Sequence, residues 1–406
     1  MLYREAKKSG DHLSILGFGC MRLPQNNQGI DAPRATRQLH DAIDHGVNYI
    51  DTALPYHSGA SEPFLGQVLQ HGYRDKVFLA TKLPHWLVRS REDMDRILRA
   101  QLKRLRTDHI DYYLLHSLEK GSWNKMVQMG ALSFLDNART QGLIRHAGFS
   151  FHGDYDTFTT IVDSYDWAMC MIQYSLLDEA IQAGRRGLLY AAERDLAVMV
   201  MEPLRGGLLA GRMPREITDI YAASATTMTP AAWALRWLWN QPEVSVVVSG
   251  MNEEAHIKEN IALADLGEPN TLSNDELDVL HRVKHTFAEL LAIPCTGCGY
   301  CMPCPAGVNI PACFEIFNTR HTYKDNDRAR IFYITRLTGV TGTDKAYPSL
   351  CRDCGQCLEH CPQHLDIPAL LQQVAKDFET PPMKLIAWLG RPLVRLYRWW
   401  SLRRLR

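Results

Sequence analysis

The chain of 406 residues lacks a long apolar segment, and this absence limits where we expect it to act. Its first residues, Met1–Arg4, do not begin the apolar run of a signal peptide. No stretch approaches the roughly 18 uninterrupted apolar residues of a membrane span. Net charge is also absent, because 45 basic residues face 45 acidic ones and the formal charge is +0. We therefore expect a cytoplasmic protein with no nucleic-acid partner.

Acidic residues are missing from the last segment, residues 381–406, which carries seven basic residues. Within Pro392–Arg406 the apolar residues follow helical spacing and form one face: Leu393, Leu396, Tyr397 and Trp400. A basic helix with Trp and Leu suits an anionic membrane surface or a partner protein. We expect such a peripheral contact, at the inner face of the membrane if it is a membrane. Packing against the rest of the chain is the alternative.

Short apolar runs alternate with helix-like segments over roughly the first 250 residues. Such unbroken runs are typical of parallel strands buried on both faces. The eight expected strands are Ser14–Gly19, Tyr49–Thr52, Val77–Thr81, Tyr112–Leu115, Ala147–Ser150, Ala168–Gln173, Ala197–Met201 and Val244–Val248. The expected helices include Ala32–His45, Arg91–Leu105, Asp178–Arg194, Glu253–Ala264 and Asn274–Leu291. This alternation predicts an α/β fold, a (β/α)8 TIM barrel over residues 1–290, with a doubly wound sheet as the alternative.

A dinucleotide-binding fingerprint is incomplete at the end of the first expected strand. Gly17-Phe18-Gly19 lacks the third glycine, because Arg22 stands at that position. We interpret the two glycines as a tight turn at the strand end.

Four polar residues stand at or just past the ends of three expected strands. They are Asp51, Tyr56, Lys82 and His116. In barrels of this kind the strand ends at one mouth hold the catalytic residues. A tyrosine can protonate a carbonyl oxygen, a nearby lysine lowers the pKa of the tyrosine, and an aspartate holds the lysine. A histidine can orient the carbonyl oxygen.

The sequence around these positions resembles the aldo-keto reductase family. The matching stretches are Asn48–Tyr56, Ala80–Lys82 and Asp111–His116, and the resemblance covers residues 1–290. It implies a barrel with a catalytic Asp, Tyr, Lys and His, a nicotinamide cofactor and a carbonyl substrate.

The resemblance also implies residues that hold the nicotinamide cofactor. They are Ser150 and Gln173 beside the nicotinamide, Pro203, Leu204, Gly206 and Gly207 over the pyrophosphate, and Ser249, Gly250, Met251, Glu259 and Asn260 on the adenosine side. Some positions depart from the family pattern. Met201 replaces a stacking Tyr, Phe151 an Asn, and Gly250 and His256 the Lys and Arg that grip a 2′-phosphate. NADH and NADPH therefore both stay open.

Eight of the eleven cysteines form two dense runs, each ending in Cys-Pro, within a segment rich in Pro and Gly. The runs are Cys295, Cys298, Cys301 and Cys304, then Cys351, Cys354, Cys357 and Cys361. The second run has the spacing of bacterial ferredoxins, and the first is one residue shorter. After each run Asn309 or Asp366 is placed to begin a helix. We expect Cys20, Cys170 and Cys313, which lie outside the runs, to be buried apolar residues.

The ferredoxin resemblance implies two [4Fe–4S] clusters in a small, mostly helical domain over residues 291–380. In such domains the fourth cysteine of each run ligates the other cluster. This assigns Cys295, Cys298, Cys301 and Cys361 to one cluster and Cys351, Cys354, Cys357 and Cys304 to the other. The alternative is that the cysteines bind zinc instead of clusters.

Two functions follow from these features. The first is an oxidoreductase that reduces an aldehyde or ketone with nicotinamide, coupled to electron transfer through two clusters and a redox partner protein. The second is an electron-transfer protein whose barrel binds a ligand or partner without carbonyl reduction. A flavin linking hydride and single-electron chemistry stays open, although the sequence carries no flavin motif.

Overall fold

A computed structural model describes residues 1–207, 209–211, 213–290, 292–293, 295, 301–340, 344–359, 361, 365–386, 388 and 390. The chain divides into two compact units. The first comprises Met1–Glu179, Ala183–Ala210 and Met228–Leu277, and the second comprises Ala180–Gln182, Gly211–Thr227 and Asp278–Arg406.

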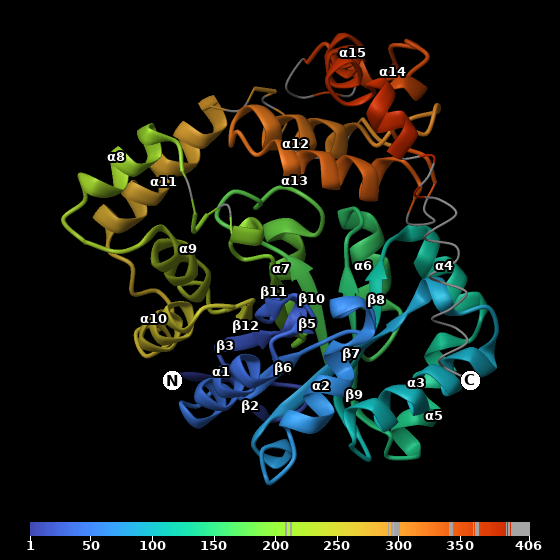
Figure 1. Ribbon diagram of the computed structural model, residues 1–406, viewed down its shortest axis with the longest axis vertical. Coiled ribbons are helices and arrows are strands. Elements are labelled where there is room, and N and C mark those ends of the chain that lie inside the picture. The colour runs from blue at the N-terminus through green and yellow to red at the C-terminus, as the bar shows by residue number, and fades with distance from the viewer. Residues whose placement is uncertain are drawn as a thin grey trace. The chain divides into compact units, whose positions relative to one another are not determined.

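The first unit is a closed barrel of eight parallel strands (Figure 1). In barrel order they are β10 (Met169–Gln173), β11 (Ala197–Met201), β12 (Val244–Ser249), β3 (Leu16–Gly19), β6 (Tyr49–Asp51), β7 (Phe78–Pro84), β8 (Ile110–Leu118) and β9 (Ile144–Phe151). Each of the eight predicted runs forms one of these strands. The predicted (β/α)8 fold is therefore confirmed, and the doubly wound alternative is wrong.

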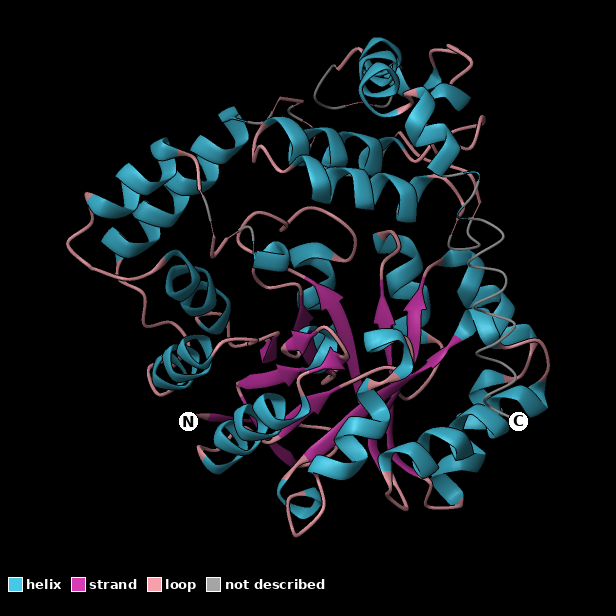
Figure 2. Ribbon diagram, in the orientation of Figure 1, coloured by secondary structure: helices cyan, strands magenta, loops and turns pink. Residues whose placement is uncertain are grey.

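Helices surround the strands of this unit, as Figure 2 shows. They are α1 (Ala32–Asp44), α2 (Ser61–Val68), α3 (Arg91–Leu105), α4 (Lys120–Gln128), α5 (Ala131–Thr140), α6 (Tyr155–Asp163), α7 (Gly184–Ala192), α9 (Pro230–Trp239) and α10 (Glu254–Ala264). Local capping explains several starts: Asp31 accepts from the Arg34 N–H, and Ser90 and Asp93 form a capping box on α3. The helix expected from Asp178 begins only at Gly184, because Asp178 is held in a turn in which it accepts the Ser175 hydroxyl.

Short 3-10 turns follow four of the strands: η1 (Cys20–Arg22), η2 (Tyr56–Gly59), η4 (His85–Leu87) and η5 (Arg205–Gly207). A further one, η3 (Arg74–Lys76), lies between α2 and β7. Two small antiparallel pairs were not predicted: β1 (Tyr3–Ala6) with β2 (Asp11–Ser14), and β4 (Gln25–Asn26) with β5 (Gly29–Ile30).

The turn predicted at Gly17-Phe18-Gly19 is wrong. All three residues belong to β3, and Gly17 pairs with Tyr49 of β6. A side chain at Gly17 would lie 2.9 Å from a Val246 methyl, so the glycine allows neighbouring strands to pack closely inside the barrel. Cys20 and Cys170 are fully buried, as predicted.

The second unit is helical where it is described. Its helices are α8 (Arg215–Ala222), most of α11 (Asn274–Leu290), α12 (Ile310–His321), α13 (Asn326–Phe332), α14 (Gln356–Glu359) and α15 (Ile367–Phe378), with a π-helical turn, η6 (Tyr333–Leu337), and a 3-10 turn, η7 (Pro348–Leu350). The side chain of Asn309 accepts from the Ala312 N–H, and that of Asp366 accepts from the Ala369 N–H, so both predicted helix starts are confirmed. Cys313 is buried in the core of this unit, also as predicted.

The predicted amphipathic tail helix, Pro392–Arg406, lies outside the described residues. Within the described part of the chain, no helix is both long and apolar enough to cross a membrane.

Candidate active site

Lys82 connects two other residues of the four expected at the barrel mouth, Asp51 and Tyr56. It lies in β7, beside β6, and its Nζ donates to both carboxylate oxygens of Asp51 at 2.7 Å. The same Nζ donates to the Thr52 carbonyl at 2.9 Å and lies 3.4 Å from the Tyr56 hydroxyl. Lys82 and Asp51 are almost inaccessible, with 1% and 3% of their surface exposed. A buried ion pair is thereby linked to a partly buried tyrosine.

Burial changes the acidity of this group. It raises the pKa of Tyr56 above its usual value, although Lys82 opposes the effect. Lys82 does lower the pKa of Tyr56, as expected, but the loss of water on burial has the larger effect and the net direction is upward. Burial alone would lower the pKa of Lys82, but Asp51 and Tyr56 outweigh it and the pKa rises. At neutral pH, Lys82 is an ammonium and Tyr56 a phenol.

His116, in β8, faces Tyr56 with its ring edge. The two ring centroids are 6.5 Å apart and the rings are close to perpendicular. Burial, reinforced by the charges of Lys82, His152 and His85, lowers the pKa of His116 well below 6.5. Its Nδ1 is buried and has no hydrogen-bond partner in the described part of the protein. His116 is thus a neutral imidazole with an unsatisfied nitrogen, which fits a ligand that supplies the partner.

Two residues of the site were missed from sequence. Trp86, in η4 directly after β7, lies 5.0 Å from His116 between ring centroids. His57 follows Tyr56 in a left-handed conformation at φ 51°, and Ser58 repeats it at φ 55°. Backbone strain of this kind concentrates at functional sites. Lys82 was predicted because it directly follows the apolar run of β7. Trp86 lies beyond that run, and the apolar pattern gave no reason to select it.

Ser150 and Gln173, expected beside the nicotinamide, lie at the same mouth as the four polar residues. Ser150 is near the end of β9 and Gln173 closes β10, and both are buried. The Ser150 Oγ accepts the Ser117 N–H at 2.7 Å, which fixes the hydroxyl one strand away from His116. Both side chains are placed to meet a ligand at this end of the barrel.

The loop after β11 contains the residues expected over the pyrophosphate. Pro203 and Leu204 lead into η5, where Gly206 and Gly207 adopt φ values of 65° and 98°. Space around Gly207 is open, because an added Cβ would meet no atom within 4 Å. Arg205 ties the loop to Asp178, its Nε lying 3.0 Å from the carboxylate. Glycines with positive φ turn backbone N–H groups toward one side, which suits a phosphate.

The segment expected on the adenosine side follows β12. Ser249 and Asn260 are buried and joined, the Asn260 Nδ2 donating to the Ser249 Oγ at 3.3 Å. Met251 is buried, whereas Glu259 accepts the Thr229 hydroxyl at 2.6 Å near the surface. Gly250 connects these residues at the strand end. The residues expected to hold nicotinamide thus come from four strand ends of one barrel, and their chemistry fits a dinucleotide.

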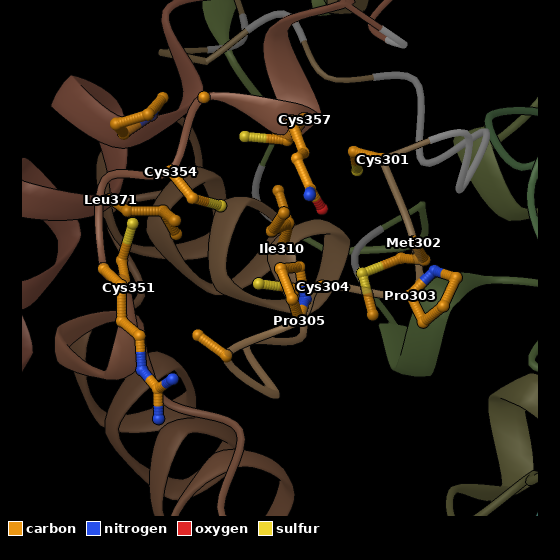
Figure 3. A pocket seen from close by; sticks show the side chains of 15 residues that line it. Cys301, Met302, Pro303, Cys304, Pro305, Ile310, Cys351, Cys354, Cys357 and Leu371 are labelled. Carbon is orange, nitrogen blue, oxygen red and sulfur yellow. The ribbon is translucent and has the colours of Figure 1, made fainter.

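Five cysteines of the second unit line one cavity of 320 Å³. Four of them were assigned to one cluster from the spacing, and the fifth, Cys301, to the other cluster. Figure 3 shows Cys304, Cys351, Cys354 and Cys357 around this space, with Cys301 to one side beside Met302. The Asp353 N–H donates to the Cys351 sulfur at 3.4 Å. Several thiols in a largely apolar cavity, which Arg352 and Gln356 also line, fit an iron–sulfur cluster.

The other expected ligand set is only partly described. Cys295, Cys301 and Cys361 are partly buried and pack against the core of the second unit, while Cys298 lies outside the described residues. Among the residues that are described, no three His, Cys, Asp or Glu side chains converge as they would on a single metal ion.

A closed parallel barrel with a Lys-centred polar site at one mouth defines a (β/α)8-barrel protein with a candidate active site. Comparison with known families identifies which one. The model of the aldo/keto reductase family matches residues 15–281, more than half of the chain, and that of the 4Fe-4S dicluster domain matches residues 294–365. The chain belongs to the aldo/keto reductase family and carries a C-terminal 4Fe-4S domain.

Relatives and solved structures agree with this assignment. An uncharacterized oxidoreductase of Bacillus subtilis, YqkF, is 26% identical over 71% of this chain and 98% of its own length. The methylglyoxal reductase YeaE of Escherichia coli is 28% identical over 60% of this chain and 82% of its own. The aldo-keto reductase AKR11C1 from Bacillus halodurans, in its holo form, superimposes with a TM-score of 0.60 at 25% identity, covering 70% of this chain and 96% of that one. A Klebsiella pneumoniae aldo-keto reductase in complex with NADPH gives a TM-score of 0.57 at the same identity and covers the same shares of the two chains.

Proposed function

We propose that the barrel reduces an aldehyde or ketone to an alcohol, with Tyr56 as the proton donor. The observation that carries this proposal is the Lys82 ammonium, which binds the Asp51 carboxylate and reaches the Tyr56 hydroxyl at 3.4 Å. When the phenol gives its proton to the substrate oxygen, the resulting phenolate faces a fixed cation. Asp51 keeps that cation in place.

His116 orients the substrate in this proposal. Its neutral ring and unpartnered Nδ1 provide one hydrogen-bonding atom next to the Tyr56 ring. A carbonyl oxygen held by Tyr56 and His116 receives the proton from Tyr56. A bound nicotinamide supplies the hydride that the carbonyl carbon needs. We assign its binding to Ser150, Gln173, the Pro203–Gly207 loop, the Ser249–Met251 segment, Glu259 and Asn260.

The names of two relatives support a proposal for the substrate class. Two Escherichia coli relatives bear the name methylglyoxal reductase, one of them described as NADH-specific. We propose a small aldehyde of this kind, and Trp86 beside His116 gives it an apolar surface. Reduction of methylglyoxal should be assayed with NADH and with NADPH.

Tyr56→Phe tests the proposed proton donor. Turnover of methylglyoxal should fall by about 10²–10⁴-fold, the usual contribution of a general acid, while nicotinamide binding stays unchanged. Tyr73→Phe is the matched control, because Tyr73 donates its hydroxyl to Asp44 outside the site. Equal turnover in Tyr56→Phe and wild type contradicts the assignment.

The iron–sulfur unit exchanges electrons with a redox partner in our proposal. Cys351, Cys354, Cys357 and Cys304 hold one [4Fe–4S] cluster, and the second is held by Cys295, Cys298, Cys301 and Cys361. Anaerobic purification with iron and sulfide analysis should return about eight of each per chain, since each cluster has four. Bleaching of the cluster absorbance by NADH or NADPH supports coupled redox chemistry. Reduction by dithionite alone supports the electron-transfer alternative.

The proposed domain limits are residues 1–290, 291–380 and 381–406. The basic tail is proposed to contact an anionic membrane or a partner, because it has no acid and carries Leu and Trp residues. A chain ending at Glu379 should lose this contact in cell fractionation. Equal membrane association of the two forms contradicts it.

A further inference from the structure

Arg22 stands at the mouth of the barrel where two neighbouring strands end. β3 and β12 run parallel, and Phe18 pairs with Ser249. The chain leaves β3 through η1, which ends at Arg22, and leaves β12 through Gly250. Arg22 is exposed, and no acidic side chain lies within ion-pair distance of it in the described part of the chain. A guanidinium therefore faces solvent at the rim of the proposed cofactor site.

Gly250 makes room for this arginine. A Cβ added at Gly250 would lie 3.2 Å from both the Cβ and the Cδ of Arg22, so the aliphatic part of Arg22 lies against the glycine backbone. The φ of Gly250 is not in the left-handed region, so its conformation does not require glycine. Space is the physical reason for glycine at this position.

The segment that carries Arg22 is anchored on the turn of the proposed proton donor. The Leu23 N–H donates to His57 Nε2 at 3.2 Å, and Gln25 Nε2 lies 2.8 Å from His57 Nδ1. His57 directly follows Tyr56. Arg22 is thus held on a fixed loop beside the site rather than on a free one.

Acidic groups near the end of β12 are already paired. Glu253 and Glu254, at the start of α10, accept from the Arg34 guanidinium at 2.6 Å and 2.5 Å. Arg34 thus offsets one of these two negative charges and holds both carboxylates, and Arg22 provides positive charge next to Gly250. Arginine binds phosphate through two N–H groups at once and stays charged at any physiological pH.

We propose that Arg22 binds a phosphate group of the nicotinamide dinucleotide. This inference rests on the proposed use of that cofactor. The dinucleotide offers its pyrophosphate and, in NADPH, a 2′-phosphate, and both have the chemistry that a guanidinium recognises. Gly250, at the end of β12, has no charged side chain. Arg22, which follows the neighbouring strand β3, supplies a positive charge beside it.

Arg22→Ala tests the proposal by fluorescence titration of the holoprotein with NADPH and NADH. Affinity should fall about 10- to 100-fold, the range of one hydrogen bond to a charged group. Loss for NADPH alone assigns the 2′-phosphate, and equal loss for both assigns the pyrophosphate. Arg99→Ala removes the same charge from the surface of α3, where Arg99 donates to Gln141, and should leave both affinities unchanged. Unchanged binding in Arg22→Ala, or an equal loss in Arg99→Ala, overturns the proposal.

Gly250→Ala probes the same contact from the other side. Its added methyl group must displace Arg22, so it should weaken binding in the wild-type chain and have little further effect in Arg22→Ala. If the losses of dinucleotide affinity add in the double variant, the two residues act independently. That result would refute displacement of Arg22 as the reason why Gly250→Ala weakens binding. If wild-type protein binds neither NADPH nor NADH, the proposed function itself fails. If wild-type protein binds either dinucleotide and Arg22→Ala does not change the affinity, only this inference fails.

Discussion

Lys82→Met isolates the electrostatic centre of the barrel mouth. The substitution keeps much of the side-chain volume but removes the ammonium that donates two 2.7 Å hydrogen bonds to Asp51. Asp51 is 3% exposed and hardly reaches water, so its carboxylate would be left buried and unpaired. Breaking one partner out of a buried ion pair costs about 3–5 kcal/mol.

This cost predicts a large change in thermal unfolding. For a domain of this size one kcal/mol moves the midpoint by about 2–4 °C, so Lys82→Met should lower it by about 6–20 °C. Asp51→Asn in the same background should recover part of the loss, because it removes the stranded charge. Calorimetric scans of wild type, Lys82→Met and the double variant at one scan rate, anaerobically and with clusters loaded, measure both effects.

The pH dependence of the deficit has a definite sign. Burial already raises the pKa of Asp51, and loss of Lys82 raises it further. An acid with a raised folded pKa is stabilised by protonation, so the deficit of Lys82→Met should shrink as the pH falls from 8 toward 5. Lys7→Met is the control, since Lys7 forms its 2.7 Å pair with Asp195 at the exposed surface. A deficit in Lys82→Met no larger than in the control would refute a buried, charged Asp51–Lys82 pair.

Two further predictions concern acidity and cluster content. Because burial raises the pKa of Tyr56, kcat/KM for carbonyl reduction should stay level through neutral pH and fall only above pH 10, when the phenol loses its proton; a fall centred near pH 7–8 would mean that Lys82 dominates. Cys304→Ser removes one thiol from the cavity that also contains Cys351, Cys354 and Cys357, so iron content should drop from about eight to about four atoms per chain. Loss of both clusters or of neither would contradict the assignment of Cys304 to a single cluster.

Buried strands were the most predictable part of the fold. Apolar runs such as Val244–Val248 have both faces inside the barrel, and a continuous run carries that information in the sequence itself. Strand ends were less predictable, because β7 extends to Pro84 through Lys82 and β8 to Leu118 through His116. Lys82 and His116 interrupt the apolar runs in the sequence, yet both strands continue past them. Lys82 pairs with Asp51 at the mouth, and His116 packs against the Trp86 ring.

Contacts that depend on distant segments were invisible in the sequence. Trp86 meets His116 because β7 pairs with β8, and Arg22 meets Gly250 because β3 pairs with β12 and closes the barrel. The β1–β2 pair was missed for a related reason: Lys7–Gly10 forms its turn within a short, polar segment without a periodic pattern. Helix caps were predictable, because Asn309 and Asp366 act within three residues of themselves.

The acidity of Tyr56 shows why residue identity alone did not give the state of the site. Tyrosine beside lysine suggests an easily lost proton, and that reasoning holds in water. In the barrel, burial raises the pKa of Tyr56 by more than Lys82 lowers it, and the Asp51 carboxylate also raises it. In the proposed reduction, the neutral Tyr56 keeps its proton until a substrate oxygen takes it, and the Lys82 ammonium then stabilises the phenolate. The arrangement therefore favours donation of a proton during reduction over storage of a phenolate beforehand.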